Sequence, residues 1–547
     1  MTKNLNTTNS TFIVPYKQDN NYKHNNKNRI LIMKAHFELK NILQDINGES
    51  YESYKSIKGE FLFNDYILYV DHVQEDAFSS PSNMRVKIAQ SVALFPDDTY
   101  SNRSREVALR DFITRKFYES IQTYCEADID LKESGPISIE NPGQEILERS
   151  TAFIDQSYVE IRFTLRLPCS GNNVEGDLAE DIIFNKLRKI ISNSLLFENL
   201  DKEALYQHIK TYEDADFLRN ELENLRLIAF VAEGSILPRR SDNSSLPMES
   251  DRAIPFISPN NLKMDVELPN MGQITGLGIP RGITFILGSD SNARSTLLNA
   301  IAEGIYNHIP GDGREYVVSN PNSVKIGAEI GRNVKSVNIS AFCSNIEDSI
   351  SFSTENADFA TSRAANIVEA VEVGADVLLL DDNTDTYIEK AAGLFNEYMV
   401  SSIIAAVELD KYYDIANYVI QINHNKALDM ALEAKDRSIN NLFDSAIGPI
   451  AERIPLEESI DSSEIDLSSI EHIVSDSQKH AISEAVEYAK KYMDGKKSFR
   501  QVCSLVMLDI GRVGLDVLNP KLSGNYAEFR KLELAAAINR LKTLKVE

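Results

Sequence analysis

The chain has 547 residues, a quarter of them charged, and a formal net charge of −25. That length exceeds what one hydrophobic core usually serves, so it predicts several domains. The negative charge disfavours nonspecific nucleic-acid binding, and a nucleic acid could bind only at a local basic patch or an internal basic pore.

Apolar runs and cysteines indicate the class of protein. No apolar run approaches the ~18 residues that a membrane span requires, so we expect no membrane insertion. The four cysteines stand singly, without a Cys-x-x-Cys pair or histidines at metal-binding spacing. This pattern is typical of buried reduced thiols in a soluble intracellular protein.

Residues 1–33 form a basic segment rich in Asn, Lys, Thr and Ser, without helical or strand periodicity. The composition predicts a disordered leader, and Met33 is an alternative start. A mitochondrial transit peptide is a second interpretation, but the segment has Arg29 as its single arginine and no clear amphipathic helix. We expect a cytoplasmic location, with a mitochondrial one as the alternative.

Residues 34–250 alternate short β-type runs, clearest at 61–70 and 158–167, with helical stretches, which predicts an N-terminal α/β domain. The basic stretch 103–116 is interleaved with the aromatic residues Phe112, Phe117 and Tyr118, as a nucleic-acid surface would be. Because Glu106 and Asp111 lie among these bases, a solvated helix with intrahelical ion pairs is the simpler interpretation. A Ser, Asn and Pro cluster at 241–247 places a domain boundary near residue 250.

The next predicted domain, residues 251–455, begins with the frame of a phosphate loop. Residues 282–287 have the pattern of a buried strand, and a helix opens at Ser295 and Thr296. Such a strand, loop and helix form a Walker A motif, in which backbone amides and a helix N-terminus bind phosphate. The loop that connects them consists of Gly288, Ser289, Asp290, Ser291, Asn292, Ala293 and Arg294.

Three residues of this loop conflict with phosphate binding. Ala293 replaces the second glycine of Gly-x-x-x-x-Gly-Lys-[Ser/Thr], and its Cβ disfavours conformations that glycine admits. Arg294 replaces the lysine, whose compact charge a planar guanidinium does not reproduce. Asp290 adds a carboxylate, which repels a phosphate charge ~4 Å away by about 4 kcal/mol at an effective dielectric constant of 20. The sequence predicts weakened ATP binding.

His308 lies in an Asn-His-Ile-Pro-Gly-Asp-Gly turn. A histidine invites a catalytic interpretation, but polar side chains in tight turns commonly bond to the backbone. We therefore expect His308 to be structural.

An apolar strand at 377–380 ends in Asp381 and Asp382, the form of a Walker B motif. Asp381 would hold Mg²⁺ together with Ser295. Asp382 stands where a glutamate would position the attacking water, and its shorter side chain misplaces that water; an error of ~1 Å can cost ~100-fold in rate. An acid pair that caps the following helix is the alternative.

Residues 456–547 are predicted to be an acidic linker and a C-terminal helical domain. The acidic, serine-rich stretch 457–477 holds few large apolar residues, so we expect it to contribute no core. The last predicted helix, 528–544, spaces its apolar residues near the helical period and should pack: Leu532, Leu534, Ala535, Ile538 and Leu541.

Several long stretches of the chain carry a family resemblance: 69–78, 104–114, 137–149, 236–240, 276–282, 306–318, 364–370 and 514–518. There the sequence resembles the predicted ABC-class ATPases of bacteria and some eukaryotes. The resemblance implies an α/β fold, with a P-loop NTPase (ABC-ATPase-like) core between an N-terminal α/β domain and a C-terminal helical domain. It also implies ATP and Mg²⁺ as the cofactors, if any is bound.

The resemblance places the family's signature, Ser-Gly-Ser in such proteins, on Asp358, Phe359 and Ala360. That triplet normally presents a serine, backbone amides and a helix N-terminus to the γ-phosphate across a dimer interface. Asp358 can cap its own helix instead, and Phe359 blocks a close approach to the backbone. The stretch 383–400 also looks shorter than its counterpart in the family.

These departures favour a catalytically impaired pseudo-ATPase that serves as a scaffold for a protein or ribonucleoprotein partner. A slow, nucleotide-gated ATPase is one alternative, because Ser295, Thr296 and Asp381 could still hold Mg²⁺. An RNA- or DNA-binding protein is another, with basic residues lining a pore at Arg239, Arg240 and Arg281. Since both faces of the nucleotide site have lost ligand contacts, any homodimer is expected not to depend on nucleotide.

Overall fold

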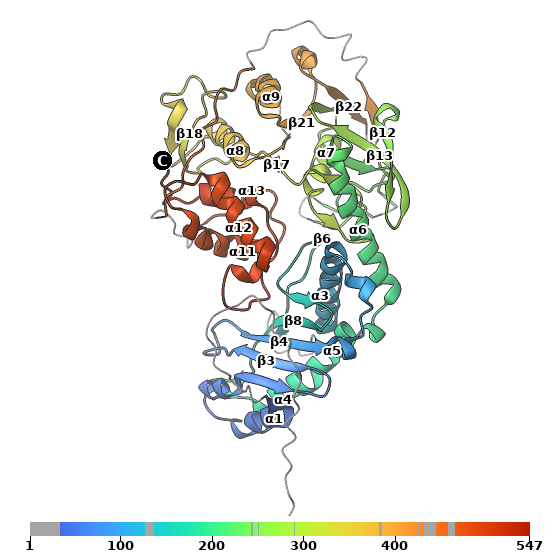
Figure 1. The fold of residues 1–547 in the computed structure, drawn as a ribbon, viewed down its shortest axis with the longest axis vertical. Coiled ribbons are helices and arrows are strands. Elements are labelled where there is room, and N and C mark those ends of the chain that lie inside the picture. Colours follow the sequence, from blue (N-terminus) through green and yellow to red (C-terminus); the bar gives the residue numbers. More distant parts are fainter. Residues whose placement is uncertain are drawn as a thin grey trace, which may run out of the picture.

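The computed structural model describes residues 33–125, 136–241, 244–249, 251–288, 290–381, 385–423, 426–430, 445–457 and 465–547. The predicted leader up to residue 32, Ser289 and Asp382 lie outside these residues. Figure 1 shows the N-terminal sheet at one end, the phosphate-loop region at the other, and the C-terminal helices beside both. No helix in the described ranges is both long and apolar enough to cross a membrane.

The N-terminal region is built on a seven-stranded sheet in the order β1-β2-β3-β4-β8-β5, with β7 paired to β8. Its strands are β1 (Lys34–Ala35), β2 (Gly59–Leu62), β3 (Ile67–His72), β4 (Ser82–Ala89), β5 (Ile137–Ser138), β7 (Ala152–Ile154) and β8 (Tyr158–Leu165). The helices are α1 (His36–Asp45), α2 (Gln90–Ala93), α3 (Arg103–Cys125), α4 (Gly176–Asp181), α5 (Leu187–Leu195) and α6 (Lys202–Asn224). The predicted run 61–70 is thus a hairpin, β2 and β3, rather than one strand.

Helix α3 contains the basic stretch 103–116, and the predicted ion pairs are present. Arg115 lies 2.6 Å from Asp111, and Arg110 lies 3.1 Å from Glu106. The expectation of a solvated helix is wrong, however, because both residues are buried: Arg110 donates to the carbonyl oxygens of Arg149 and Ala152, and Asp111 lies beside His208 of α6. Their charges are neutralised inside the domain, where unpaired charges would be very costly.

A four-stranded antiparallel sheet in the order β12-β13-β11-β16 follows. It consists of β11 (Leu227–Ala232), β12 (Lys263–Leu268), β13 (Gly272–Pro280) and β16 (Val317–Ser319). The boundary predicted near residue 250 would separate β11 from both strands with which it pairs. The polar cluster at 241–247 therefore does not mark a domain boundary, because backbone ladders join the segments on its two sides.

The phosphate-loop region contains a six-stranded sheet in the order β17-β20-β21-β14-β22-β23, parallel except for β23. The strands are β14 (Ile283–Leu287), β17 (Ser323–Lys325), β20 (Val377–Leu380), β21 (Ser401–Ala406), β22 (Tyr418–Asn423) and β23 (Lys426–Asp429). Its helices are α7 (Ser291–Glu303), α8 (Phe359–Val373) and α9 (Asp385–Tyr398). The central strands read as continuous apolar runs because helices cover both faces of a parallel sheet.

Three smaller pairs complete the strands: β6 (Glu145–Ile146) with β15 (Asn307–His308), β9 (Cys169–Ser170) with β10 (Asn173–Val174), and β18 (Val334–Val337) with β19 (Phe352–Thr354). The first of these joins the N-terminal region to the segment after α7.

The C-terminal helices are α11 (Asp476–Ala489), α12 (Phe499–Val513) and α13 (Lys531–Asn539). Their apolar faces share one buried cluster with β14, β20, α8 and α9, so they form part of the same core. The prediction that the last helix packs is confirmed, since Leu534 and Ile538 are fully buried. The stretch 457–477 does contribute core, contrary to expectation, because Leu467 and Ile470 lie in that cluster.

Candidate functional site

The segment between β14 and Ser295 is more helical than a phosphate loop. Helix α7 begins at Ser291, four positions before the predicted start. Asp290 is its N-cap: the carboxylate accepts a hydrogen bond from the Asn292 amide at 2.9 Å. The cause lies in the residues, because Asp caps helices well and alanine at 293 favours a helix by about 1 kcal/mol over glycine. Most of the predicted loop is therefore an additional helical turn.

The side chain of Arg294 points back toward the first residue of its own loop, Gly288. Its guanidinium donates a hydrogen bond from Nη1 to the carbonyl oxygen of Gly288. Gly288 is confined, because a Cβ there would meet the Ile422 carbonyl oxygen at 2.6 Å. Ala293 is buried beside the following turn. The cation at the lysine position is thus engaged by the backbone.

Ser295 and Asp381 are brought together as the sequence predicted for a Mg²⁺ pair. Ser295 lies in α7, and Asp381 directly follows the last residue of β20. The Ser295 hydroxyl donates a hydrogen bond to Asp381 Oδ1 at 3.0 Å. Thr296 is the next residue of α7 and is half-buried. Within the described residues no cluster of three or more His, Cys, Asp or Glu side chains could hold a metal. A cation here would need oxygen ligands from elsewhere, such as phosphate and water.

The predicted signature triplet lies at the start of α8, where Asp358 is the N-cap. Its carboxylate accepts from the Thr361 amide at 2.8 Å, and the Asp358 amide donates to Thr361 Oγ1 at 3.0 Å. These bonds to Thr361 hold the pKa of Asp358 below its usual range. The expected capping by Asp358 is confirmed, and it occupies the site that an anion would take.

Phe359 and Ala360 form the first turn of α8 and are exposed. The Phe359 side chain is 46% exposed, with the Arg363 guanidinium 5.2 Å from its ring centre. An aromatic ring therefore covers the turn where the family's glycine would leave the backbone open.

His308 is structural, as expected. It is fully buried in β15, and Nδ1 lies 3.1 Å from Asp312 Oδ2. The same carboxylate accepts two hydrogen bonds from the Arg239 guanidinium, at 2.9 and 3.0 Å. Burial alone would raise the pKa of Asp312, but His308 and Arg239 lower it to about 2. Arg239 is consequently engaged inside the protein, whereas Arg240 and Arg281 are exposed.

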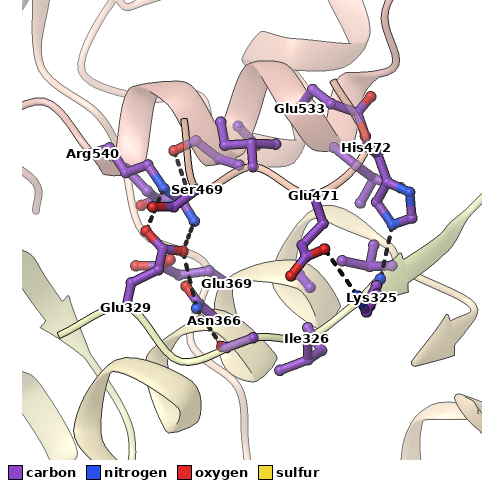
Figure 2. A pocket seen from close by; sticks show the side chains of 18 of the residues that line it. Lys325, Ile326, Glu329, Asn366, Glu369, Ser469, Glu471, His472, Glu533 and Arg540 are labelled. Atoms are coloured by element: carbon purple, nitrogen blue, oxygen red, sulfur yellow. Dashed lines mark hydrogen bonds and ion pairs between the residues drawn. The ribbon is translucent and has the colours of Figure 1, made fainter. Parts of the chain in front are cut away.

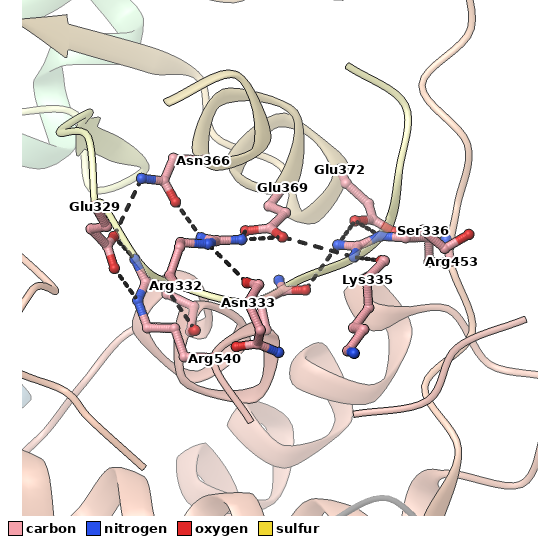
Figure 3. Close-up of polar contacts among 12 residues, drawn as sticks. Glu329, Arg332, Asn333, Lys335, Ser336, Asn366, Glu369, Glu372, Arg453 and Arg540 are labelled. Atoms are coloured by element: carbon pink, nitrogen blue, oxygen red, sulfur yellow. Dashed lines mark hydrogen bonds and ion pairs between the residues drawn. The ribbon is translucent and has the colours of Figure 1, made fainter. Parts of the chain in front are cut away.

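A buried network of charges that sequence patterns missed lies near the C-terminal end of α8 (Figure 3). Glu369 and Glu372 project from α8 and bind Arg332 and Arg453, and all four side chains are buried. One signal was available, because two acids three residues apart interrupt the otherwise apolar second half of this helix, residues 367–373. Their partners could not be read from the sequence, since Arg453 is 81 residues from Glu372.

Comparisons with known proteins agree with this architecture. Three family models match in succession: the N-terminal region of ATPases of the ABC class over residues 36–198, an ABC ATPase P-loop domain over 201–387, and an MRB1590 C-terminal domain over 457–547.

An uncharacterized protein of Methanocaldococcus jannaschii is 24% identical over 295 residues, which is 49% of this chain and 65% of that protein, so the chain spans just under two thirds of this relative. A solved structure of cbiO1 from Clostridium perfringens, described as part of the ABC transporter complex cbiONQ, is 16% identical. It covers 39% of this chain and 92% of its own, with a TM-score of 0.25, too low to carry an argument.

Proposed function

Because the chain belongs to the ABC-class ATPase family, we propose that it is a catalytically impaired member that works as a scaffold or binding module. One observation carries the proposal. The helix N-terminus that should receive phosphate is capped by the chain's own carboxylate, Asp290. A helix N-terminus binds anions through its free backbone amides and the positive end of the helix dipole. A carboxylate of the same chain that bonds to these amides takes the place of the anion.

The phosphate-binding residues do not fit a triphosphate. Asp290 repels it, Arg294 is turned toward Gly288, and the residues from Ser291 onward follow a helix rather than wrapping an anion. The second phosphate-facing helix, α8, is capped by Asp358 in the same way. No hydrolytic step is therefore derived for this site. Asp382, at the position of the general base, lies outside the described residues and stays a prediction.

A scaffold role would leave the fold intact while the nucleotide site decays. The buried ion pairs and shared core support this role, because they join the phosphate-loop region to the C-terminal helices without any ligand. We propose a protein or ribonucleoprotein as the partner. The net charge of −25 and the paired cations of α3 favour a protein contact, with nucleic acid confined to a local patch such as one around Arg240 and Arg281.

A nucleotide switch is the second candidate, and one contact favours it. Ser295 and Asp381 lie 3.0 Å apart, close enough for both oxygens to share one Mg²⁺. Such a protein would bind nucleotide weakly and turn it over slowly.

Steady-state hydrolysis separates the two. The full-length protein and Asp381→Ala should both show Mg-ATP turnover at background level. Slow turnover above background that is abolished in Asp381→Ala would establish the switch, and turnover near a typical enzyme's ~10 per second would overturn the impaired-ATPase proposal outright.

A further inference from the structure

Helix α8 is held by a buried network of charges to which residues 445–457 contribute Arg453, as Figure 3 shows. Arg332 binds Glu369 with contacts of 2.6 and 2.7 Å. Arg453 binds Glu372 with contacts of 2.7 and 3.1 Å. Each of these four side chains is at most 8% exposed, so the pairs are shielded from solvent.

Arg453 is the centre of this network because it touches five residues in four separate segments. Beyond Glu372, its guanidinium donates to Asn539 of α13 at 2.9 Å and to the Lys335 carbonyl of β18 at 2.9 Å. It also lies 4.8 Å from the ring centre of Phe499 in α12, and 3.8 Å from Glu369. One side chain thus connects α8 and the β18 strand to two C-terminal helices.

Residues 465–547 also contact the edge strand of the parallel sheet, β17, and the residues just before it. Arg530 donates to the carbonyl oxygens of Pro321 and Ser323 at 2.7 and 2.8 Å. The Lys325 amide donates to His472 Nε2 at 2.8 Å, and Lys325 Nζ lies 3.0 Å from Glu471 (Figure 2). A cavity of about 70 Å³ remains between this strand, α8 and α13.

We propose that residues 445–457 and 465–547 act as a brace that fixes α8 against the parallel sheet. The orientation of the helix behind Asp358–Ala360 is then set by protein contacts rather than by a ligand. The inference does not depend on whether nucleotide binds, because every contact that carries it lies within the chain.

The physical reason is the cost of separating buried charges. Releasing α8 from the brace would take Arg453 away from Glu372 and leave that carboxylate without its partner in a low-dielectric core, which is strongly destabilising. Burial already raises the pKa of Glu372 despite the nearby Arg453. A helix held in this way opens together with its partners instead of rotating alone.

Hydrogen exchange of the full-length protein, followed by mass spectrometry, tests the brace. In Arg453→Gln, Glu372 loses its partner, so exchange should rise on the order of 100-fold. The increase should appear together in peptides covering α8, α13 and 445–457, while α3 stays unchanged. Lys490→Gln, which removes a cation paired within the C-terminal unit to Glu487, is the matched control and should leave α8 unchanged.

A milder variant keeps the test decisive if Arg453→Gln does not fold. Arg453→Lys keeps a cation beside Glu372 but loses the fork that reaches Asn539 and Lys335, so a joint increase of roughly tenfold is expected. Acceleration limited to 445–457, with α8 unchanged, would overturn the brace.

Adding Mg-ATP to the wild-type protein separates this inference from the proposed function. Exchange in α8 should not change. If calorimetry shows tight ATP binding while α8 stays unchanged, the proposed function falls and the brace stands. If Mg-ATP alters exchange throughout α8, the brace itself is wrong.

Discussion

Replacing Asp290 by Asn should raise the affinity for Mg-ATP. The carboxylate caps α7 by accepting from the Asn292 amide at 2.9 Å, so a phosphate at this N-terminus would come within about 4 Å of it. At that separation two unit charges repel by about 4 kcal/mol at an effective dielectric constant of 20. Since every ~1.4 kcal/mol is tenfold in affinity, on the order of 1000-fold is the upper limit.

The expected gain is smaller than this limit. Asp290 is exposed, and salt at physiological strength screens charges over ~8 Å, so about 10- to 100-fold is expected. Asn caps helices as well as Asp does, so the start of α7 should persist. The variant therefore removes a charge while it preserves the structure.

Titration calorimetry with Mg-ATP at 50 and 150 mM salt measures the effect, which should be larger at the lower salt concentration. Glu198→Gln makes the same change in net charge at an exposed site of the N-terminal region and should leave the affinity unchanged. Equal affinities for wild type and Asp290→Asn, with α7 intact, would refute the electrostatic reasoning.

The remaining predictions concern the loop, the dimer and pH. Asp290→Gly with Ala293→Gly and Arg294→Lys should raise ATP affinity in calorimetry without strong hydrolysis, because the signature at α8 stays capped; no gain in affinity would show that the loop is not a decayed phosphate site. Any homodimer should have the same mass in light scattering with and without Mg-ATP, and a mass that doubles only with nucleotide contradicts this. Burial, with the charges of Arg530 and Lys325, holds the pKa of His472 well below 6.5, so the folded protein keeps it neutral. Stability should fall as pH drops below the unfolded value, by up to ~1.4 kcal/mol per pH unit. His472→Gln keeps an acceptor for the Lys325 amide and should lose less stability in urea between pH 7.5 and 5.5; an equal loss would contradict this assignment.

Two strands of the parallel sheet could be predicted because each is a distinct apolar run in the sequence. The runs 283–287 and 377–380 are continuous apolar segments followed by polar loops, and both are strands. The cap at Asp358 was predictable too, since capping depends on neighbouring residues alone. In these cases the residues of the segment itself were sufficient to predict its structure.

The start of α7 shows where a motif misleads. Aligning Gly288–Ser295 with a phosphate loop places the helix start at Ser295, whereas Asp290 as a cap and Ala293 as a helix former place it at Ser291. The residues that depart from the motif are the ones that extend the helix. Their local propensities account for the observed start of α7 better than the motif frame does.

Contacts between residues far apart in the chain could not be predicted from the sequence. Strands β11 and β13 pair although the polar stretch 241–247 separates them in the sequence, and Asn333 donates to the Leu541 carbonyl oxygen 208 residues away. Leu467 and Ile470 looked isolated in an acidic stretch, but α13 and α8 supply the surface that buries them. Such contacts depend on the assembled fold, which no local pattern encodes.

The nucleotide content of the freshly purified protein tests the central claim most directly. Acid releases any bound nucleotide, and chromatography then quantifies it per chain. Because Asp290 and Asp358 cap both phosphate-facing helices, far less than one nucleotide per chain is predicted. One ATP or ADP per chain, retained through purification, would contradict the account.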